Sequence, residues 1–151
     1  MALAEALVDR SDLTDLVIVT SGLTIALALE PALPRFTVIV TGGTLRPLQH
    51  SLVNPFAAPM IASLRLDMAF IGCNGIHPTG GVTNRNLPDA EVKRLAMGVS
   101  RQSVLLADSS KLGRTDLAVI APVDGFDTLV TGGDPTPASL EGLALDIRLA
   151  A

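Results

Sequence analysis

The chain has 151 residues, of which 48% are hydrophobic and 17% charged, and its formal net charge is −4. This length and apolar content suffice for one compact core, so we expect a single domain over residues 1–151. The acidic balance provides no basic surface for nucleic acid or for an anionic membrane. Cys73 is the only cysteine, which excludes a disulfide within the chain, and no segment resembles a signal peptide or a membrane span. We therefore expect a cytoplasmic protein without a membrane partner.

Helical and strand-like patterns alternate along the chain. Aromatic residues are scarce, with four Phe and no Trp or Tyr, and such an aliphatic composition is typical of parallel sheets that are buried on both faces. The alternation predicts an α/β fold: a mostly parallel sheet with helices on both faces. The expected helices are 2–9, 23–30, 55–65, 88–102 and 138–144, and the expected strands are 16–20, 36–41, 68–73, 103–108, 117–122 and 128–131.

The clearest helical pattern covers residues 88–102 and begins with Pro88. Proline suits a first helical turn, and the carboxylates of Asp89 and Glu91 suit the positive end of the helix dipole. Apolar residues then recur at the spacing of one helix face. This segment is predicted to cover one side of the sheet.

A threonine followed by glycine recurs where three of the strands end, in "VIVTSG" (17–22), "VIVTGG" (38–43) and "TLVTGG" (128–133). One interpretation is that strand ends need such residues to turn. The other is that small residues let backbone amides approach a ligand, since open α/β sheets bind ligands at the carboxyl ends of their strands.

The first candidate binding loop is "TGGTLRPLQHSLVNP" (41–55), with Gly42, Gly43 and Arg46 just beyond a strand. Glycines allow backbone amides to converge on an anion, and a guanidinium binds a phosphate through two hydrogen bonds. The loop lacks the Lys-Ser/Thr ending of a P-loop and the third glycine of a dinucleotide-binding motif. A glycine turn beside a solvated arginine remains the alternative.

Two further loops carry polar side chains. The connection 71–86 is long and rich in glycine and asparagine, and we expect it to have no secondary structure of its own. Its Asn74 and Thr83 could bind sugar hydroxyls or could serve turns only. In "VLLADSSKLG" (104–113), Lys111 follows a strand end and could neutralise a phosphate or remain solvated.

Other chemistries find little support in the sequence. Two histidines and one cysteine without close spacing do not form a zinc site, and we expect no metal and no cofactor. Cys73 and His77 could pair as nucleophile and base, but no third residue is placed to orient them.

Taken together, these stretches resemble the C-terminal sensor domain of the DeoR family of bacterial transcriptional regulators. The most specific stretches are "FIGCNGI" and "LLADSSKLG", and the resemblance covers about residues 16–132. It implies a fold related to ribose-5-phosphate isomerase and glucosamine-6-phosphate deaminase. It also implies a regulator, usually a repressor of sugar catabolism, that forms homo-oligomers and binds a phosphorylated sugar or related metabolite.

The resemblance also implies which residues bind the effector. Gly43 and Arg46, with Gly42 beside them, match the family's Gly-Gly-x-x-Arg loop. The remaining residues match its G-x-D/N-G turn, the threonine that follows, the helix start and the D-S-S-K stretch: Gly72, Asn74, Gly75, Thr83, Glu91, Ser109 and Lys111. The family's N-terminal helix-turn-helix, through which DNA would be bound, and its first sensor strand with the Gly-Thr-Thr loop have no counterpart in this chain.

The resemblance implies a sensor and not an enzyme. Ile71, Asn74 and Gly75 stand where the related isomerases carry acidic residues, and a sugar isomerase needs a base. Two alternatives stay open: an isomerase or deaminase with Glu91 as base and Lys111 as electrostatic stabiliser, and an oligomerisation core that binds no ligand. The effector, the operator and the direction of regulation are not readable from the sequence.

Overall fold

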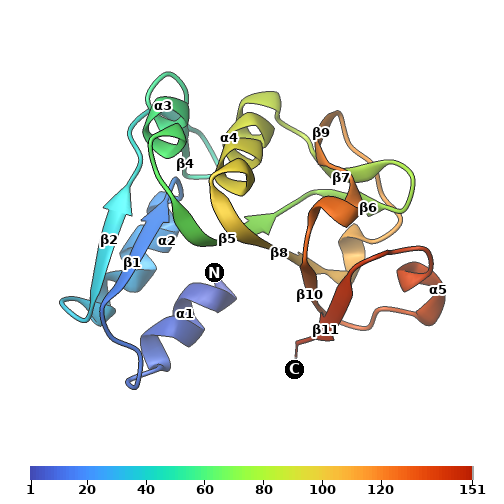
Figure 1. Ribbon diagram of the computed structural model, residues 1–151, viewed down its shortest axis with the longest axis horizontal. Coiled ribbons are helices and arrows are strands. Elements are labelled where there is room, and N and C mark those ends of the chain that lie inside the picture. Colours follow the sequence, from blue (N-terminus) through green and yellow to red (C-terminus); the bar gives the residue numbers. More distant parts are fainter. Residues whose placement is uncertain (151) are drawn as a thin grey trace. The chain divides into compact units, whose positions relative to one another are not determined.

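The computed structural model describes residues 1–150, which divide into two compact units. The first unit is Met1–Met60, and the second begins at Ile61 (Figure 1). Each unit has a buried apolar cluster of its own. The expectation of one domain over the whole chain stays a prediction.

The first unit contains a parallel pair of strands, β1 and β2, and an antiparallel hairpin, β3 and β4. Leu29, Ala32 and Phe36 form the centre of its core, together with Ala4 from the first helix. The elements are α1 (Ala2–Asp9), β1 (Leu16–Thr20), α2 (Leu23–Leu29), η1 (Glu30–Ala32), β2 (Phe36–Val40), β3 (Thr44–Arg46) and β4 (Ser51–Val53), and α3 (Ala57–Ala62) crosses the unit boundary.

The second unit contains a four-stranded parallel sheet in the order β11-β10-β8-β5 and an antiparallel sheet in the order β6-β7-β9 (Figure 1). This arrangement confirms the predicted α/β class with a mostly parallel sheet. The elements are β5 (Leu66–Gly72), β6 (Gly75–His77), β7 (Gly81–Asn84), α4 (Leu87–Gly98), β8 (Ser100–Asp108), η2 (Ser109–Lys111), β9 (Ala118–Ala121), η3 (Val123–Gly125), β10 (Thr128–Gly132), α5 (Pro137–Leu140) and β11 (Asp146–Leu149).

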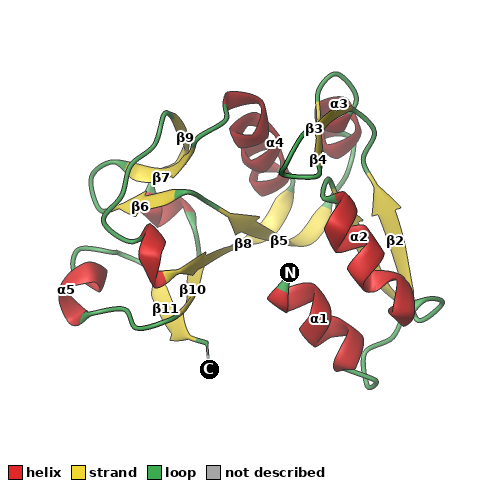
Figure 2. Cartoon of the chain, turned by 180° about the vertical axis from the view of Figure 1, so that it is seen from behind, coloured by secondary structure: helices red, strands yellow, loops and turns green. Residues whose placement is uncertain are grey.

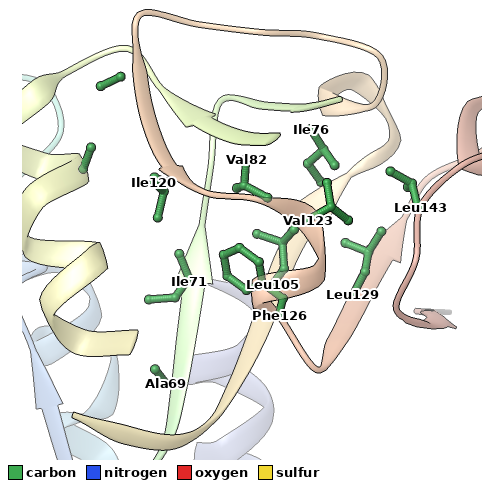
Figure 3. Close-up of a cluster of buried hydrophobic side chains, with 12 residues drawn as sticks. Ala69, Ile71, Ile76, Val82, Leu105, Ile120, Val123, Phe126, Leu129 and Leu143 are labelled. Carbon is green, nitrogen blue, oxygen red and sulfur yellow. The ribbon is translucent and has the colours of Figure 1, made fainter. Parts of the chain in front are cut away.

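The core of the second unit lies on one face of the parallel sheet. Ile71, Leu105 and Leu129 are neighbours in register across β5, β8 and β10, and each is at most 4% exposed. Figure 3 shows these side chains directed toward Phe126 and Val123, which follow β9. Aliphatic residues at every second strand position therefore create a continuous packed layer, as expected for side chains that alternate between faces.

Several elements differ from the sequence-based expectation. The connection 71–86, expected to lack secondary structure, contains the hairpin β6–β7 (Figure 2). Its turn is closed by Gly81 at φ +76° and by His77, whose Nδ1 accepts hydrogen bonds from the backbone N–H groups of Thr79 and Gly80. Strands of three or four residues are too short to show the alternation that identifies a strand.

The hairpin β3–β4 and strand β11 were also missed, and the expected strand 117–122 pairs antiparallel with β7 and not within the parallel sheet. Helix α4 ends at Gly98 and not at residue 102 as expected, since residues 100–102 pair with β5 as the first part of β8. Among residues 1–150, no helix is long and apolar enough to cross a membrane.

Candidate functional site

Strands β5 and β8 are adjacent and parallel, so their carboxyl ends lie at the same edge of the sheet (Figure 1). Gly72, the last residue of β5, is paired in register with Leu106 of β8. Cys73 and Asn74 follow β5 directly, and the short helix η2 with Lys111 follows β8. This edge is where open α/β sheets bind their ligands.

Backbone hydrogen bonds join these loops to the hairpin. The Asn74 N–H donates to the Thr83 carbonyl at 2.9 Å, and the Gly113 N–H donates to the Ile76 carbonyl at 2.8 Å. The structure thus brings together the predicted site residues of the β5 loop, the hairpin and η2.

Gly75 is required at its position by close packing. A Cβ there would lie 2.5 Å from the Arg114 carbonyl oxygen and 2.9 Å from Thr83 Oγ1. At Gly72, by contrast, a Cβ would meet no heavy atom within 4 Å. Of these two predicted site glycines, only Gly75 lies where the neighbouring atoms leave no room for a Cβ.

The side chains of Thr83 and Asn74 hold the neighbouring backbone. Thr83 is 1% exposed, and its hydroxyl accepts a hydrogen bond from the Asp116 N–H at 2.8 Å and donates to the Gly75 carbonyl at 3.4 Å. Asn74 Oδ1 accepts from the Arg85 N–H at 2.9 Å. Both residues shape the loop, and their direct contact with a sugar hydroxyl stays a prediction.

Helix η2 presents Lys111 beside Asp108. Asp108 Oδ1 accepts a hydrogen bond from the Ser110 N–H at 2.9 Å and caps the helix. Hydrogen bonding to Ser110 lowers the pKa of Asp108, against a smaller opposing effect of desolvation, and the nearby Lys111 lowers it further. Lys111 Nζ lies 3.9 Å from Asp108 Oδ2, so the two groups form an ion pair without a hydrogen bond, and the Lys111 side chain is 32% exposed.

Ser109, the other predicted site residue of this stretch, lies against the loop after β10. A Cβ on Gly133, which has φ +79°, would approach Ser109 Oγ to 2.6 Å. The Thr-Gly-Gly sequence at the end of β10 therefore lets its loop pack closely on η2, as a turn requires.

A second lysine at this site was missed by the sequence analysis. Lys93 of α4 donates to Asn84 Oδ1 at 2.9 Å and lies 2.9 Å from Asp89 Oδ2. Asn84, which is 3% exposed, donates in turn to the same Asp89 oxygen at 2.8 Å. The i, i+4 spacing of Asp89 and Lys93 was visible in the sequence, whereas nothing there indicated Asn84 as their partner.

Cys73 lies close to both lysines. Burial raises the pKa of the Cys73 thiol to about 11, while the ammonium groups of Lys93 and Lys111 act in the opposite direction and Asp108 adds to the rise. The thiol is therefore protonated at neutral pH and is a poor nucleophile. Lys93 and Lys111 are thus the cations whose charges act on the residue that follows β5.

Glu91 lies on a different side of α4. It is exposed, and it is two residues from both Asp89 and Lys93, which corresponds to a rotation of roughly 200° about the helix axis. The acid of α4 that joins the polar cluster is Asp89. A ligand contact by Glu91 stays a prediction.

The other predicted residues, Gly42, Gly43 and Arg46, belong to the first unit. Gly43 has φ +138°, and a Cβ there would lie 1.7 Å from the Val53 carbonyl oxygen, so the β3–β4 hairpin requires glycine. Arg46 Nη2 donates to Gln49 Oε1 at 3.4 Å on the surface. A pocket shared by the two units stays a prediction.

Within residues 1–150, no group of three or more His, Cys, Asp or Glu side chains could hold a metal ion. The polar groups near the edge of the sheet include ammonium groups, amides and backbone N–H groups, which suit an anionic ligand with hydroxyls, beside the carboxylates of Asp89 and Asp108.

The sequence matches the family described as the DeoR C terminal sensor domain over residues 1–133. Curated relatives include the HTH-type transcriptional regulator GolR of Listeria innocua, 32% identical over 131 residues, which are 87% of this chain and 50% of that protein. The glycerol-3-phosphate regulon repressor of Escherichia coli is 28% identical over 142 residues, 94% of this chain and 55% of that protein.

The HTH-type transcriptional regulator GlpR of Haloferax volcanii is 35% identical over 96 residues, 64% of this chain and 38% of that protein. The chain thus spans about half the length of the curated relatives that it matches.

Proposed function

Because the chain belongs to the DeoR C-terminal sensor domain family, we propose that it is the effector-binding part of a transcriptional regulator and that its ligand is a phosphorylated sugar or related metabolite. The observation that carries this proposal is Lys111. Its side chain, on η2 after β8, is 32% exposed, and its ammonium lies 3.9 Å from Asp108 Oδ2, beyond hydrogen-bond distance.

The chemistry of the surrounding loops supports an anionic, hydroxylated ligand. A phosphate monoester carries nearly two negative charges at neutral pH and has oxygens that accept several hydrogen bonds. Lys111 supplies a point charge for such a group. The loop after β5 supplies glycine backbone and the amide of Asn74, which offers both a donor and an acceptor.

We propose that the ligand acts by selecting among arrangements that the protein already populates. An effector shifts such an equilibrium only as far as its affinities for the two arrangements differ. In a homo-oligomeric regulator, the favoured arrangement would set the placement of DNA-binding modules of the kind that the names of the relatives indicate. Several relatives are named as repressors and one as the L-fucose operon activator.

We propose binding without turnover. In the loop after β5, Asn74 carries an amide and not a carboxylate. Its Oδ1 accepts a hydrogen bond from the Arg85 N–H. An amide cannot serve as the general base that a sugar isomerase needs. Incubation with ribose 5-phosphate and glucosamine 6-phosphate should leave both compounds unchanged.

The test is a binding titration with matched pairs of compounds. Glycerol 3-phosphate, ribose 5-phosphate and glucose 6-phosphate are compared with glycerol, ribose and glucose by calorimetry and thermal shift. We expect at least one phosphorylated compound to bind, its neutral partner to bind far more weakly, and Lys111→Met to weaken binding about tenfold or more. Absence of binding by every phosphorylated compound in such a panel would refute the proposal.

A further inference from the structure

The polar cluster formed by Asn84, Asp89 and Lys93 is more elaborate than a surface ion pair. The Lys93 side chain is 22% exposed and that of Asp89 is 16% exposed, and both contact Asn84, which is almost fully buried. Charged side chains are seldom this buried unless they are paired, because water solvates them better than protein does.

The position of the Lys93 ammonium is fixed from two elements. Asp89 is one turn earlier on α4, and Asn84 is the last residue of β7. The Asn84 amide cannot rotate without loss, because its Nδ2 donates both to Asp89 Oδ2 at 2.8 Å and to the Asn86 carbonyl at 3.2 Å. An ammonium has three N–H groups. The two contacts with Asn84 and Asp89 leave one for another acceptor.

The cluster is joined to the loop that follows β5. Asn84 follows Thr83, whose carbonyl accepts the hydrogen bond from the Asn74 N–H at 2.9 Å. Lys93 and Lys111 both act on the thiol of Cys73, the residue before Asn74. Backbone pairing thus links the strand that carries Asn84 to the loop after β5, while Lys111 lies on η2, which follows the neighbouring strand β8.

We propose that Lys93 is the second cation of the ligand site and donates a hydrogen bond to the phosphate of the bound metabolite, while Asn84 and Asp89 act as positioning residues for its ammonium. The inference rests on the proposed function and adds a second phosphate-binding residue to the same site. Two ammonium groups in one ligand site would favour a dianionic phosphate monoester over a singly charged carboxylate, since the attraction grows with the ligand charge.

In the alternative, Lys93 has a structural role only: its ammonium neutralises the Asp89 carboxylate and does not contact the ligand. The two roles differ in the double variant Asp89→Asn/Lys93→Met, which removes both charges together. If Lys93 only neutralises Asp89, the double variant should bind as wild type does. If Lys93 contacts the phosphate, the double variant should bind as weakly as Lys93→Met.

The experiment measures the affinity of the phosphorylated compound that binds most tightly in the panel above, and of inorganic phosphate, for four proteins. These are wild type, Lys93→Met, Asp89→Asn/Lys93→Met and the control Arg101→Met. The Arg101 side chain is 84% exposed and lies near the start of β8, at the opposite end of the strand from η2. Its replacement by Met removes one positive charge, as Lys93→Met does. Circular dichroism and the melting temperature show that each variant folds.

We expect Lys93→Met and the double variant to bind about ten- to hundredfold more weakly, which is the usual effect of one lost hydrogen bond to a charged group, and Arg101→Met to bind as wild type does. Alkylation of Cys73, the single thiol, gives a second measurement: the bound compound should slow its reaction with iodoacetamide in wild type.

Wild-type affinity in the double variant, or an unchanged rate of Cys73 alkylation on saturation, would overturn the role of Lys93 and leave the proposed function standing. Absence of binding to wild type by any phosphorylated compound would overturn both proposals.

Discussion

Gly75→Ala offers a sharp test of how the site is built, because the glycine separates two segments that almost touch. The added Cβ would lie 2.5 Å from the Arg114 carbonyl oxygen, 2.8 Å from the carbonyl carbon and 2.9 Å from Thr83 Oγ1. Two of these three atoms belong to the backbone. The strain cannot be relieved by rotating a flexible side chain, so the loop at Arg114 must move.

The expected cost combines two effects. Overpacking of a well-packed site typically costs about 1–3 kcal/mol. Movement of the loop would also weaken the 2.8 Å hydrogen bond from the Asp116 N–H to Thr83 Oγ1, which contributes about 1 kcal/mol. We therefore expect a loss of about 3 kcal/mol in the free energy of unfolding, which corresponds to a fall of roughly 6–12 °C in melting temperature for a chain of this size.

The matched control is Gly72→Ala, at the end of β5. No heavy atom lies within 4 Å of a Cβ at this position, so the substitution should change stability by at most about 0.5 kcal/mol. Thermal melts followed by circular dichroism compare the two variants. Equal melting temperatures for Gly75→Ala and wild type, or an equal fall for both variants, would show that the packing argument is wrong.

Three further measurements address the same unit. Thr83→Val removes a hydroxyl that accepts a hydrogen bond from the Asp116 N–H, and it should lower the free energy of unfolding in urea by about 1–3 kcal/mol. Thr83→Ser keeps the hydroxyl and should lower it less. Equal losses of stability would contradict the role of the hydrogen bonds. Alkylation of Cys73 should accelerate about tenfold per pH unit between about pH 8 and 10, because its pKa is raised to about 11, and a plateau near pH 9 would disagree with this value. Leu105→Ala, at a fully buried position, should cost about 2–5 kcal/mol, while Leu117→Ala, at 80% exposure, should cost less than about 0.5 kcal/mol.

The sequence was most informative where a segment is long and its pattern local. The expected strand 103–108 lies within β8, and the helix expected from Pro88 onward is α4, because a dozen periodic residues identify a helix face without knowledge of any partner. The position of Lys111 also follows from the sequence. It stands three residues after a buried strand, and the carboxyl ends of parallel strands share one edge.

The hairpins could not be found in this way. Strands β6 and β7 have three and four residues, and the turn between them depends on a hydrogen bond from backbone to His77 and on the left-handed conformation of Gly81. The loop was expected to be irregular because its glycines and asparagines are common in turns. Pairing with β9, more than thirty residues later, is a long-range contact that local patterns do not contain.

By itself, the sequence determined the α/β class, the helix that begins near Pro88 and the place of Lys111 after β8, since each depends on residues that are neighbours along the chain. Only the tertiary structure decided that Asp89 and Lys93 meet at Asn84. The physical reason is that a helix pattern shows which residues share a face, whereas the strand against which that face packs is fixed by pairing between distant segments. That pairing brings Lys93 and Asp89 of α4 to Asn84 at the end of β7.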